Sequence, residues 1–383
     1  MSSLYQADHE AFRGLVRQFI EREMRPNFER WERDGLIDRD LFNRAGAIGV
    51  LGFEVPEQHG GGGVSDFRFN AVLNEELHAA GVTGAGLCLL LHTDIVMPYF
   101  LELADAGQQA RWLPGISSGE LVTAVAMTEP GAGSDVAAIA TTAERDGDHY
   151  VVNGAKTFIT NATNADLIVA AVRTGPGERH KGLTLLVVEG GMPGLERGPQ
   201  LDKLGLHSED TGELFFAEVR VPVANRLGEE GEGFVNLMRN LPRERLSIAV
   251  SAVASAKRAL DLTVSYCNER HAFGSAISGF QNTRFRLAEL ATEVEIGRTF
   301  VDDCVRELLD GLLTAERAAM AKWWCTEMQK RAVDVCMQLH GGYGYMREYP
   351  IAQAYMDARV TTIYGGTTEI MKEIIGRSVV ANQ

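Results

Sequence analysis

The sequence predicts an α+β protein, mostly α-helical, in which a β-sheet region lies between two helical regions. The first observation is proline placement, because residues 243–383 contain a single proline, Pro350, and few clusters of turn residues. The second is that six prolines, together with runs of alternating apolar and polar residues, fall between Pro114 and Pro222. The third is the helical spacing of apolar residues before about residue 120.

The helical regions form the two ends of the chain. At roughly 150 residues per domain, 383 residues are enough for two or three domains. We expect an N-terminal helical domain over residues 1–121, interrupted by Pro56 and by the glycine loop at residues 60–63. A C-terminal helical domain over residues 232–383 should hold long helices such as residues 283–309, where apolar residues recur at helical spacing.

The middle β-domain is expected over residues 122–231. Residues 150–154 and 156–160 have the alternating pattern of strands, and they predict a hairpin around the Asn153-Gly154 pair. Further strands are expected at residues 167–172, 183–188 and 214–221. The sequence has no repeat with a period of about 20–50 residues, so a solenoid or propeller is not expected.

The composition is that of an acidic globular protein. The chain has 37 Lys and Arg residues against 52 Asp and Glu residues, which gives a net charge of −15. Hydrophobic residues make up 45% and charged residues 23%, which is ordinary for a folded soluble protein. The negative charge argues against nucleic acid or an anionic membrane as the main partner. An anionic ligand would therefore need a local basic cluster or backbone N–H groups.

The cysteines and the N-terminal residues bear on the compartment. Five cysteines with no C-x-x-C pair predict reduced, mostly buried thiols; they are Cys88, Cys267, Cys304, Cys325 and Cys336. Asp8 and Glu10 stand where a signal or transit peptide would be basic. The longest uncharged apolar stretches, such as residues 82–91, are shorter than the ~20 residues that cross a bilayer. We expect a soluble cytoplasmic protein that has no membrane partner.

Three glycine-rich segments are the main candidates for ligand binding, at residues 127–135, 338–345 and 364–368. Closely spaced glycines let backbone N–H groups approach an anion or a flat ring. Each segment alone could be a surface loop or a helix end. Together they predict a large, polar and planar cofactor at a domain junction. The sequence lacks G-x-G-x-x-G, a Walker lysine, H-E-x-x-H and cysteine–histidine metal spacing, which argues against a Rossmann dehydrogenase and a metal enzyme.

An ordered set of motifs resembles the acyl-CoA dehydrogenase family over essentially the whole chain. The motifs are Ala126–Asp135, Asn153-Gly154-x-Lys156-x-Phe158-Ile159-Thr160-Asn161, Lys203-x-Gly205 with Thr211 and Glu213, Arg270-x-x-Phe273-Gly274, Gln338-x-x-Gly341-Gly342-x-Gly344-Tyr345 and Gly365-Gly366-Thr367. The resemblance implies an N-terminal helical domain, a β-barrel-like or β-sandwich middle domain and a C-terminal four-helix bundle. It also implies FAD, an acyl-CoA substrate, an electron-transfer flavoprotein as electron acceptor and a homotetramer.

The resemblance also implies the FAD contacts. Thr128 resembles the residue at the flavin pyrimidine edge, Ser134 the one near the pyrophosphate, and Thr160 the one near flavin N5. Phe158 stands where many members have tryptophan against the isoalloxazine, although simple core packing is the alternative. Arg270 resembles the arginine that neutralises the pyrophosphate across a subunit boundary. The remaining expected contacts are Met127, Gly133, Ile159, Phe273, Gln281, Gln338, Gly341, Gly342, Thr367 and Glu369.

Glu244 is the expected catalytic base. The family's reaction removes an α-proton from an acyl thioester, and a glutamate in an apolar pocket has its pKa raised toward neutrality. Many members carry this base at the position of Gly365, which has no side chain to serve. The long-chain and isovaleryl branches hold it on an earlier helix, and residues 241–246 resemble the long-chain branch. The alternative is a solvated glutamate in the first turn of a helix.

Three residues are expected at the substrate: Ser134, Arg245 and Gly365. Arg245 would supply an orienting charge or a charge in the substrate pocket. The backbone N–H of Gly365 would hold the thioester oxygen. The expected reaction is α,β-dehydrogenation of a straight medium-to-long acyl-CoA to the trans-2-enoyl-CoA in fatty-acid β-oxidation. Gln353 and Met356 replace residues that are basic in the long-chain branch. The alternatives are a branched-chain (isovaleryl) enzyme, a non-catalytic acyl-CoA-binding protein, and a flavin oxidase or monooxygenase.

Overall fold

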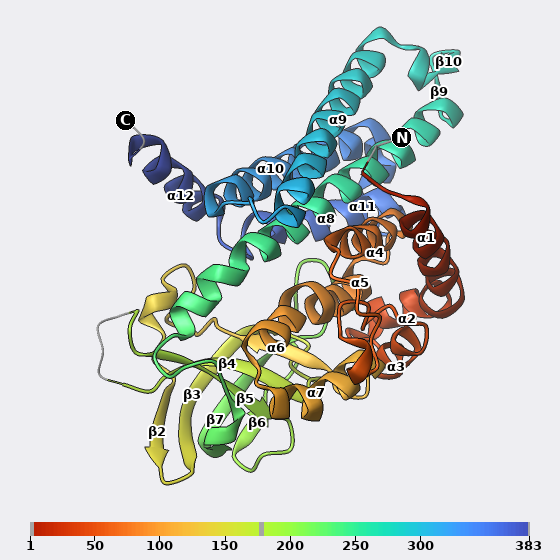
Figure 1. The fold of residues 1–383 in the computed structure, drawn as a ribbon. Helices are drawn as coiled ribbons and strands as arrows, with labels where there is room; N and C mark the ends of the chain where they lie inside the picture. The colour runs from red at the N-terminus through yellow and green to blue at the C-terminus, as the bar shows by residue number, and fades with distance from the viewer. Residues whose placement is uncertain (1–3, 176–179, 382–383) are drawn as a thin grey trace.

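The computed structural model describes residues 4–175 and 180–381. Helices at both ends of the chain flank a β-sheet part, as the sequence predicts (Figure 1). The long helix α8 (Gly233–Glu269) leaves the sheet and crosses to the far tip of the C-terminal bundle (Figure 1). At ~1.5 Å per residue this helix is about 55 Å long, and it carries the residues that matter most for function.

Residues 4–121 contain seven α-helices: α1 (Ala7–Phe19), α2 (Arg25–Asp34), α3 (Asp40–Ala47), α4 (Phe67–Ala80), α5 (Thr83–Leu90), α6 (Met97–Leu103) and α7 (Ala106–Ser118). Side-chain caps begin two of them. Asp66 accepts from the backbone N–H of Arg68 at the start of α4, and Asp105 forms a reciprocal capping box with Gln108 at the start of α7.

The uncharged apolar stretch at residues 82–91 is part of a longer helix. α5, a π-helical turn and α6 form a continuous helix, Thr83–Leu103, that is long and apolar enough to cross a membrane. Its most apolar window is 78% buried inside the protein, which is the position of a core helix. The uncharged stretch is shorter than the helix because two buried polar residues, His92 and Asp94, interrupt the apolar pattern.

The middle part is one eight-stranded mixed sheet in the order β6-β7-β3-β2-β4-β5-β8, with β1 pairing in parallel to β4. Its strands are β1 (Thr123–Ala126), β2 (Thr142–Asp146), β3 (His149–Thr160), β4 (Leu167–Arg173), β5 (Leu183–Glu189), β6 (Leu195–Arg197), β7 (Thr211–Pro222) and β8 (Arg226–Leu227). The strands expected at residues 167–172, 183–188 and 214–221 are present as β4, β5 and most of β7.

The hairpin expected at Asn153-Gly154 is wrong, because β3 continues through this pair and pairs with β7 on both sides of it. The register shifts between Val152 and Gly154, so the pair forms a β-bulge. Asn153 Oδ1 accepts from the N–H of Glu218 on β7, which holds the bulge. The turn lies earlier, between β2 and β3, at Gly147 with a φ of 64°.

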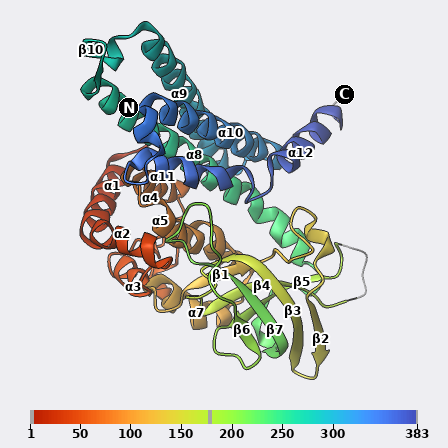
Figure 2. The ribbon, with the colours of Figure 1, turned by 180° about the vertical axis from the view of Figure 1, so that it is seen from behind.

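The C-terminal part is helical and contains α8, α9 (Gln281–Leu309), α10 (Ala315–His340), α11 (Pro350–Ala358) and α12 (Thr368–Ala381). α8, α9 and α10 pack side by side, as both views show (Figures 1 and 2). Small buried residues on α8, such as Ala252 and Ala256, let α10 approach closely. All five cysteines are buried free thiols, as expected.

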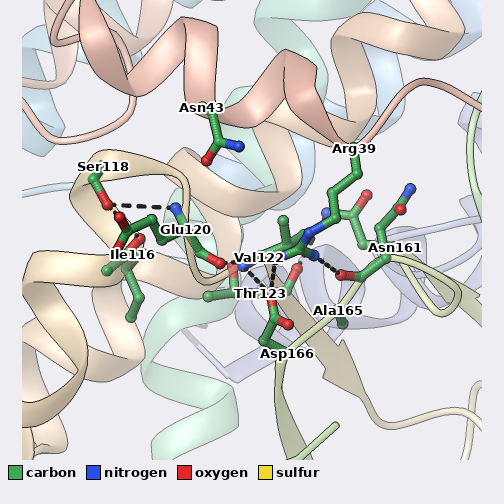
Figure 3. Close-up of polar contacts among 12 residues, drawn as sticks. Arg39, Asn43, Ile116, Ser118, Glu120, Val122, Thr123, Asn161, Ala165 and Asp166 are labelled. Carbon is green, nitrogen blue, oxygen red and sulfur yellow. Dashed lines mark hydrogen bonds and ion pairs between the residues drawn. The ribbon is translucent and has the colours of Figure 1, made fainter.

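Arg39 joins the N-terminal helices to the sheet (Figure 3). Its guanidinium donates to the carbonyls of Asn164 at 2.6 Å and Glu120 at 2.7 Å, and pairs with Asp166 at 2.6 Å. The same Asp166 oxygen accepts from the N–H of Val122 at 2.8 Å. The segments that enter β1 and β4 are therefore fixed to α3 at one point.

Candidate active site

Glu244 lies inside α8, about three turns after its start. Only 5% of the residue is exposed, and its Oε1 accepts a hydrogen bond from the Tyr99 hydroxyl on α6 at 2.9 Å. The alternative of a solvated first-turn glutamate does not hold. Tyr99 was missed by the sequence analysis, because it is 145 positions away from Glu244 and no motif links the two.

The surroundings of Glu244 tune its pKa. Burial raises the pKa to about 7, while the Tyr99 hydroxyl and the positive charge of Arg245 act in the opposite direction. A carboxyl with a pKa near 7 can accept a proton at neutral pH and remains a stronger base than an exposed glutamate. The electrostatic environment therefore suits a general base.

The Gly365 turn packs against the same face of α8. The Nε of Arg245 donates to the Gly365 carbonyl at 3.3 Å, and burial lowers the pKa of Arg245. Gly365 has a φ of 63°, which favours glycine. A Cβ at Gly365 would lie 2.3 Å from Cδ1 of Ile248, one helical turn after Glu244. A side chain at position 365 and one at position 244 would thus approach a common region.

Lys322 on α10 holds the next residue of this turn. Its Nζ is fully buried and donates to the Gly366 carbonyl at 2.6 Å. Burial, together with the charge of Arg245, lowers the pKa of Lys322 to about 8. Arg245 and Lys322 thereby fix two successive carbonyls, so the backbone of the turn has one orientation. Lys322 was also missed, since it belongs to none of the sequence motifs.

Phe158 projects from the sheet. It lies at a second bulge in β3, between Lys156 and Ile159, with a φ of 58°. A non-glycine residue in this region is uncommon and is held by its surroundings. The residue is 67% exposed, so core packing does not account for it. Thr160, two residues on, donates from its hydroxyl to Glu209 at 3.0 Å, and burial raises the pKa of Glu209.

The first glycine segment is fastened to β3 by Lys156. The buried Nζ of this lysine donates to the Met127 carbonyl at 3.1 Å and pairs with Glu129 at 2.8 Å. The N–H of Thr157 donates to the Thr128 carbonyl at 2.9 Å. Thr128 is therefore held beside the strand that carries Phe158. Further along the loop, Gly133 and Ser134 are exposed, and a Cβ at Gly133 would meet no atom within 4 Å.

The sheet side and the helix side meet near Tyr364, which directly precedes Gly365. Burial raises the pKa of Tyr364, and the charges of Glu209 and Asp357 add to this effect. Asp357 in turn accepts from the N–H of Leu206 at 2.7 Å. The Thr160–Glu209 pair on the sheet therefore lies near the turn that contacts Arg245 and Glu244. Thr367 and Glu369 follow this turn at the start of α12.

A second group of candidate residues lies far from Glu244. These residues follow the end of α8, begin α9, or lie at and after the end of α10: Arg270, Phe273, Gln281, Gln338, Gly341 and Gly342. The Arg270 guanidinium lies 5.5 Å from the centre of the Tyr343 ring, and Phe273 is 99% exposed with a φ of 51°. At ~1.5 Å per residue, Arg270 is roughly 39 Å from Glu244 along α8. One chain does not bring both groups to a single small ligand.

The described residues fit a large ligand that has a flat ring and anionic groups. An exposed aromatic side chain, Phe158, stands beside hydroxyl and backbone donors on the sheet. Built Cβ atoms at Gly131, Gly133, Gly341 and Gly342 would meet nothing within 4 Å, so the backbone at both ends is open to a ligand. Arg270 supplies a positive charge at the second end.

Comparisons with known proteins identify the family. Family models for acyl-CoA dehydrogenases match the chain in three parts: the N-terminal domain over residues 6–120, the middle domain over residues 124–219 and the C-terminal domain over residues 231–380. The mitochondrial long-chain specific acyl-CoA dehydrogenase of Rattus norvegicus is 43% identical over 381 residues, which cover 99% of this chain and 88% of that protein.

Solved structures show the same fold. The crystal structure of an acyl-CoA dehydrogenase from Geobacillus kaustophilus has a TM-score of 0.97 and 48% identity, and the match covers 99% of this chain and 100% of that one. A glutaryl-CoA dehydrogenase from Mycobacterium smegmatis, in complex with FADH2, has a TM-score of 0.91 and 26% identity over 99% and 96% of the two chains. The chain therefore belongs to the acyl-CoA dehydrogenase family of FAD-binding enzymes.

Proposed function

We propose that the protein oxidises an acyl-CoA to the trans-2-enoyl-CoA with Glu244 as the base that removes the α-proton. The observation that carries this proposal is a buried carboxyl with a pKa of about 7 on the face of α8 against which the Gly365 turn packs. FAD, when bound, supplies the acceptor for the hydride that leaves the β-carbon. The proton moves to the Glu244 carboxylate, and the Tyr99 hydroxyl orients that carboxylate by its hydrogen bond.

The enolate that develops when the α-proton leaves needs donors at the thioester oxygen. We assign this task to the backbone N–H of Gly365, whose turn is fixed by Arg245 and Lys322 through its carbonyls. Arg245 also places a positive charge in the pocket next to Glu244. Because Glu244 and Tyr99 are both buried, water has little access to the base, which preserves its raised pKa.

The residues proposed to hold FAD fall into two groups, one at each end of α8. Met127, Thr128, Gly133, Ser134, Phe158, Ile159, Thr160, Thr367 and Glu369 would bind the flavin part, and Arg270, Phe273, Gln281, Gln338, Gly341 and Gly342 would bind from another subunit. The separation of roughly 39 Å along α8 supports binding across a subunit boundary. We therefore propose a homo-oligomer, and a homotetramer in particular.

The proposed substrate is a straight acyl chain of medium to long length, in fatty-acid β-oxidation. The 43% identity to a relative named long-chain specific supports this choice. An isovaleryl-type enzyme is the second candidate. Gly365 has no side chain to act as the base, and the isovaleryl branch, like the long-chain branch, holds its base at the position of Glu244. We further propose an electron-transfer flavoprotein as the electron acceptor and the cytoplasm as the compartment, which the five free thiols support.

The test is a turnover profile. Purified protein is assayed with an artificial electron acceptor across acyl-CoAs from butanoyl to octadecanoyl, with isovaleryl-CoA alongside, and anaerobic bleaching of the ~450 nm flavin band is recorded for each. We expect the highest kcat/KM for straight medium or long chains. A maximum at isovaleryl-CoA would favour the second candidate. No bleaching by any thioester would indicate a non-catalytic binder, and rapid reaction of the reduced enzyme with oxygen would indicate an oxidase.

A further inference from the structure

A cavity of about 460 Å³ lies between the N-terminal helices and the C-terminal bundle, beyond the Gly365 turn. It is bounded by α2, the α4–α5 connection, the middle of α8 and α11, which both ribbon views place together (Figures 1 and 2). This volume is in the range of small-molecule sites, ~300–1,000 Å³. Tyr364 lines the cavity and directly precedes Gly365, so one end of the cavity adjoins the proposed catalytic residues.

α8 connects the catalytic residues to the cavity along one face. Glu244 and Ile248 are followed on that face by three residues that line the cavity, at intervals of three or four positions; these are Ser251, Ser255 and Arg258. At ~1.5 Å per residue, Arg258 is roughly 21 Å from Glu244 along the helix. An extended chain of single bonds advances ~1.2 Å per bond, as an extended backbone does, so this distance corresponds to ~17 bonds. That is the length of a long acyl chain.

Arg258 ends this path with unused hydrogen-bond donors. A guanidinium has five N–H groups and no acceptor, so a partly buried one needs oxygen partners. Among the residues that the structure describes, Arg258 makes no hydrogen bond within 3.5 Å and no ion pair within 4 Å. The nearby charge of Arg25 disfavours its protonated form, while the charge of Asp357 favours it. Burial lowers the pKa of Arg258, because removing the charged guanidinium from water is unfavourable.

The absence of a side chain at Gly81 leaves space for this guanidinium. A Cβ at Gly81, which also lines the cavity, would lie only 2.2 Å from Nη2 of Arg258. Gly81 ends α4 with a φ of 77°, so glycine is favoured there for two reasons. Ser255 adds a hydroxyl on the same wall.

Four carboxylates line the cavity, those of Glu29, Glu32, Glu348 and Asp357. Two of them bind donors other than Arg258. Glu32 accepts from the backbone N–H of Ser208 at 3.0 Å and from Gln353 at 3.1 Å. Asp357 accepts from Gln353 at 2.7 Å through the oxygen that also bonds Leu206. Among the described residues, none of the four carboxylates forms an ion pair with Arg258, so its guanidinium keeps donors for a ligand in the cavity.

Resting on the proposed function, we propose that this cavity receives the far end of the acyl chain and that Arg258 selects chains carrying an oxygen acceptor at that end. The acceptor is a hydroxyl or a carboxylate. An unsubstituted methyl end would leave the guanidinium without a partner, which costs binding free energy.

The experiment compares three CoA thioesters of equal length: hexadecanoyl-CoA, ω-hydroxyhexadecanoyl-CoA and the mono-CoA ester of hexadecanedioic acid. We expect kcat/KM for at least one oxygenated chain to exceed that of the plain chain by ~10-fold or more, the size of a hydrogen bond to a charged group. Comparison of the hydroxyl and carboxylate arms identifies which acceptor is used. Arg258→Met should bring this ratio near one, and Arg258→Lys should give an intermediate ratio.

Lys257→Met is the matched control, because it removes a positive charge from the adjacent, exposed position of α8, where Lys257 pairs with Asp261. It should keep the wild-type ratio. Dissociation constants of the same thioesters, measured by calorimetry on Glu244→Gln protein, give the ratio without turnover. A wild-type ratio of one or less in both measurements, or a ratio unchanged by Arg258→Met, would overturn the inference. Absence of turnover with plain chains of every length would instead contradict the proposed function.

Discussion

At the scale of single residues, the Tyr99–Glu244 hydrogen bond determines how readily the proposed base holds its charge. The hydroxyl stabilises the carboxylate and so lowers a pKa that burial raises to about 7. In Tyr99→Phe the pKa of Glu244 should rise. Because the base acts deprotonated, the rate of flavin reduction increases with pH through this pKa, and the rising limb should move to higher pH. The pH profile of the reductive half-reaction measures the shift.

Tyr150→Phe is a suitable control for this variant, since it removes another buried tyrosine hydroxyl that donates to a carboxylate, Glu230, at 2.8 Å. It should leave the profile unchanged. A Tyr99→Phe profile that moves to lower pH, or does not move, would show that Glu244 is not the group observed.

The raised pKa of Glu244 also predicts a pH-dependent stability. Its folded pKa of about 7 exceeds the ordinary 4.5, so its contribution favours the native state below pH 4.5 and is lost as pH rises through about 7. The glutamine in Glu244→Gln never ionises. As pH rises from 4.5 to about 7, the free energy of unfolding of this variant should therefore increase relative to wild type, by about 3 kcal/mol at most. Denaturant unfolding at acidic and alkaline pH measures this; an equal difference at both would contradict the raised pKa.

At the scale of elements, the Gly365 turn and α8 approach one region from two directions. We predict partial recovery of flavin reduction when Gly365→Glu is added to Glu244→Gln, because a side chain at either position would reach that region. The structure adds two obstacles, the φ of 63° and the 2.3 Å approach to Ile248. Adding Ile248→Ala removes the second obstacle, so the triple variant should reduce flavin faster than the double variant.

Stopped-flow rates of the two variants, each checked for folding and FAD content, decide this prediction. A folded and FAD-loaded triple variant with no more activity than Glu244→Gln alone would count against a shared region. Ile248→Ala in the wild-type background is the control for the enlarged pocket.

The elements also show which part of the structure the sequence could predict. The long helices and three of the strands follow from proline placement and periodicity, which are local properties. The hairpin at Asn153-Gly154 was wrong because the same pair serves a bulge when β7 continues the pairing on both sides. That choice depends on a strand some 60 residues later, which no local pattern contains.

At the scale of the whole molecule, FAD binding should depend on assembly through Arg270. The net charge of −15 repels a diphosphate at long range, so neutralisation must come from few nearby groups. Loss of one charge-assisted contact typically lowers affinity by ~10- to 100-fold. Arg270→Ala should therefore purify with less than one FAD per chain, and added FAD should shift it to a larger assembly.

Flavin absorbance together with light scattering measures both quantities. Arg286→Ala, which removes an exposed arginine paired with Glu289 on α9, is the control and should remain fully loaded. An Arg270→Ala protein that is fully loaded and fully assembled would exclude the inter-subunit role.

The candidate site was predictable only as far as its motifs extend. Glu244 could be singled out because Gly365 leaves the usual position without a side chain. The groups that tune and position the site, Tyr99 and Lys322, were not, because burial and contacts between distant segments arise only in the folded chain. Their roles depend on desolvation, which is a tertiary property.

The most direct test of the account is anaerobic flavin reduction by a long-chain acyl-CoA in wild-type and Glu244→Gln protein. Both proteins should carry FAD, since Glu244 is not among the residues proposed to hold it. The variant should lose ~10²–10⁴ of the reduction rate, the contribution of a positioned base. A loss of only a few fold in a folded, FAD-loaded variant would contradict the assignment of Glu244 as the base.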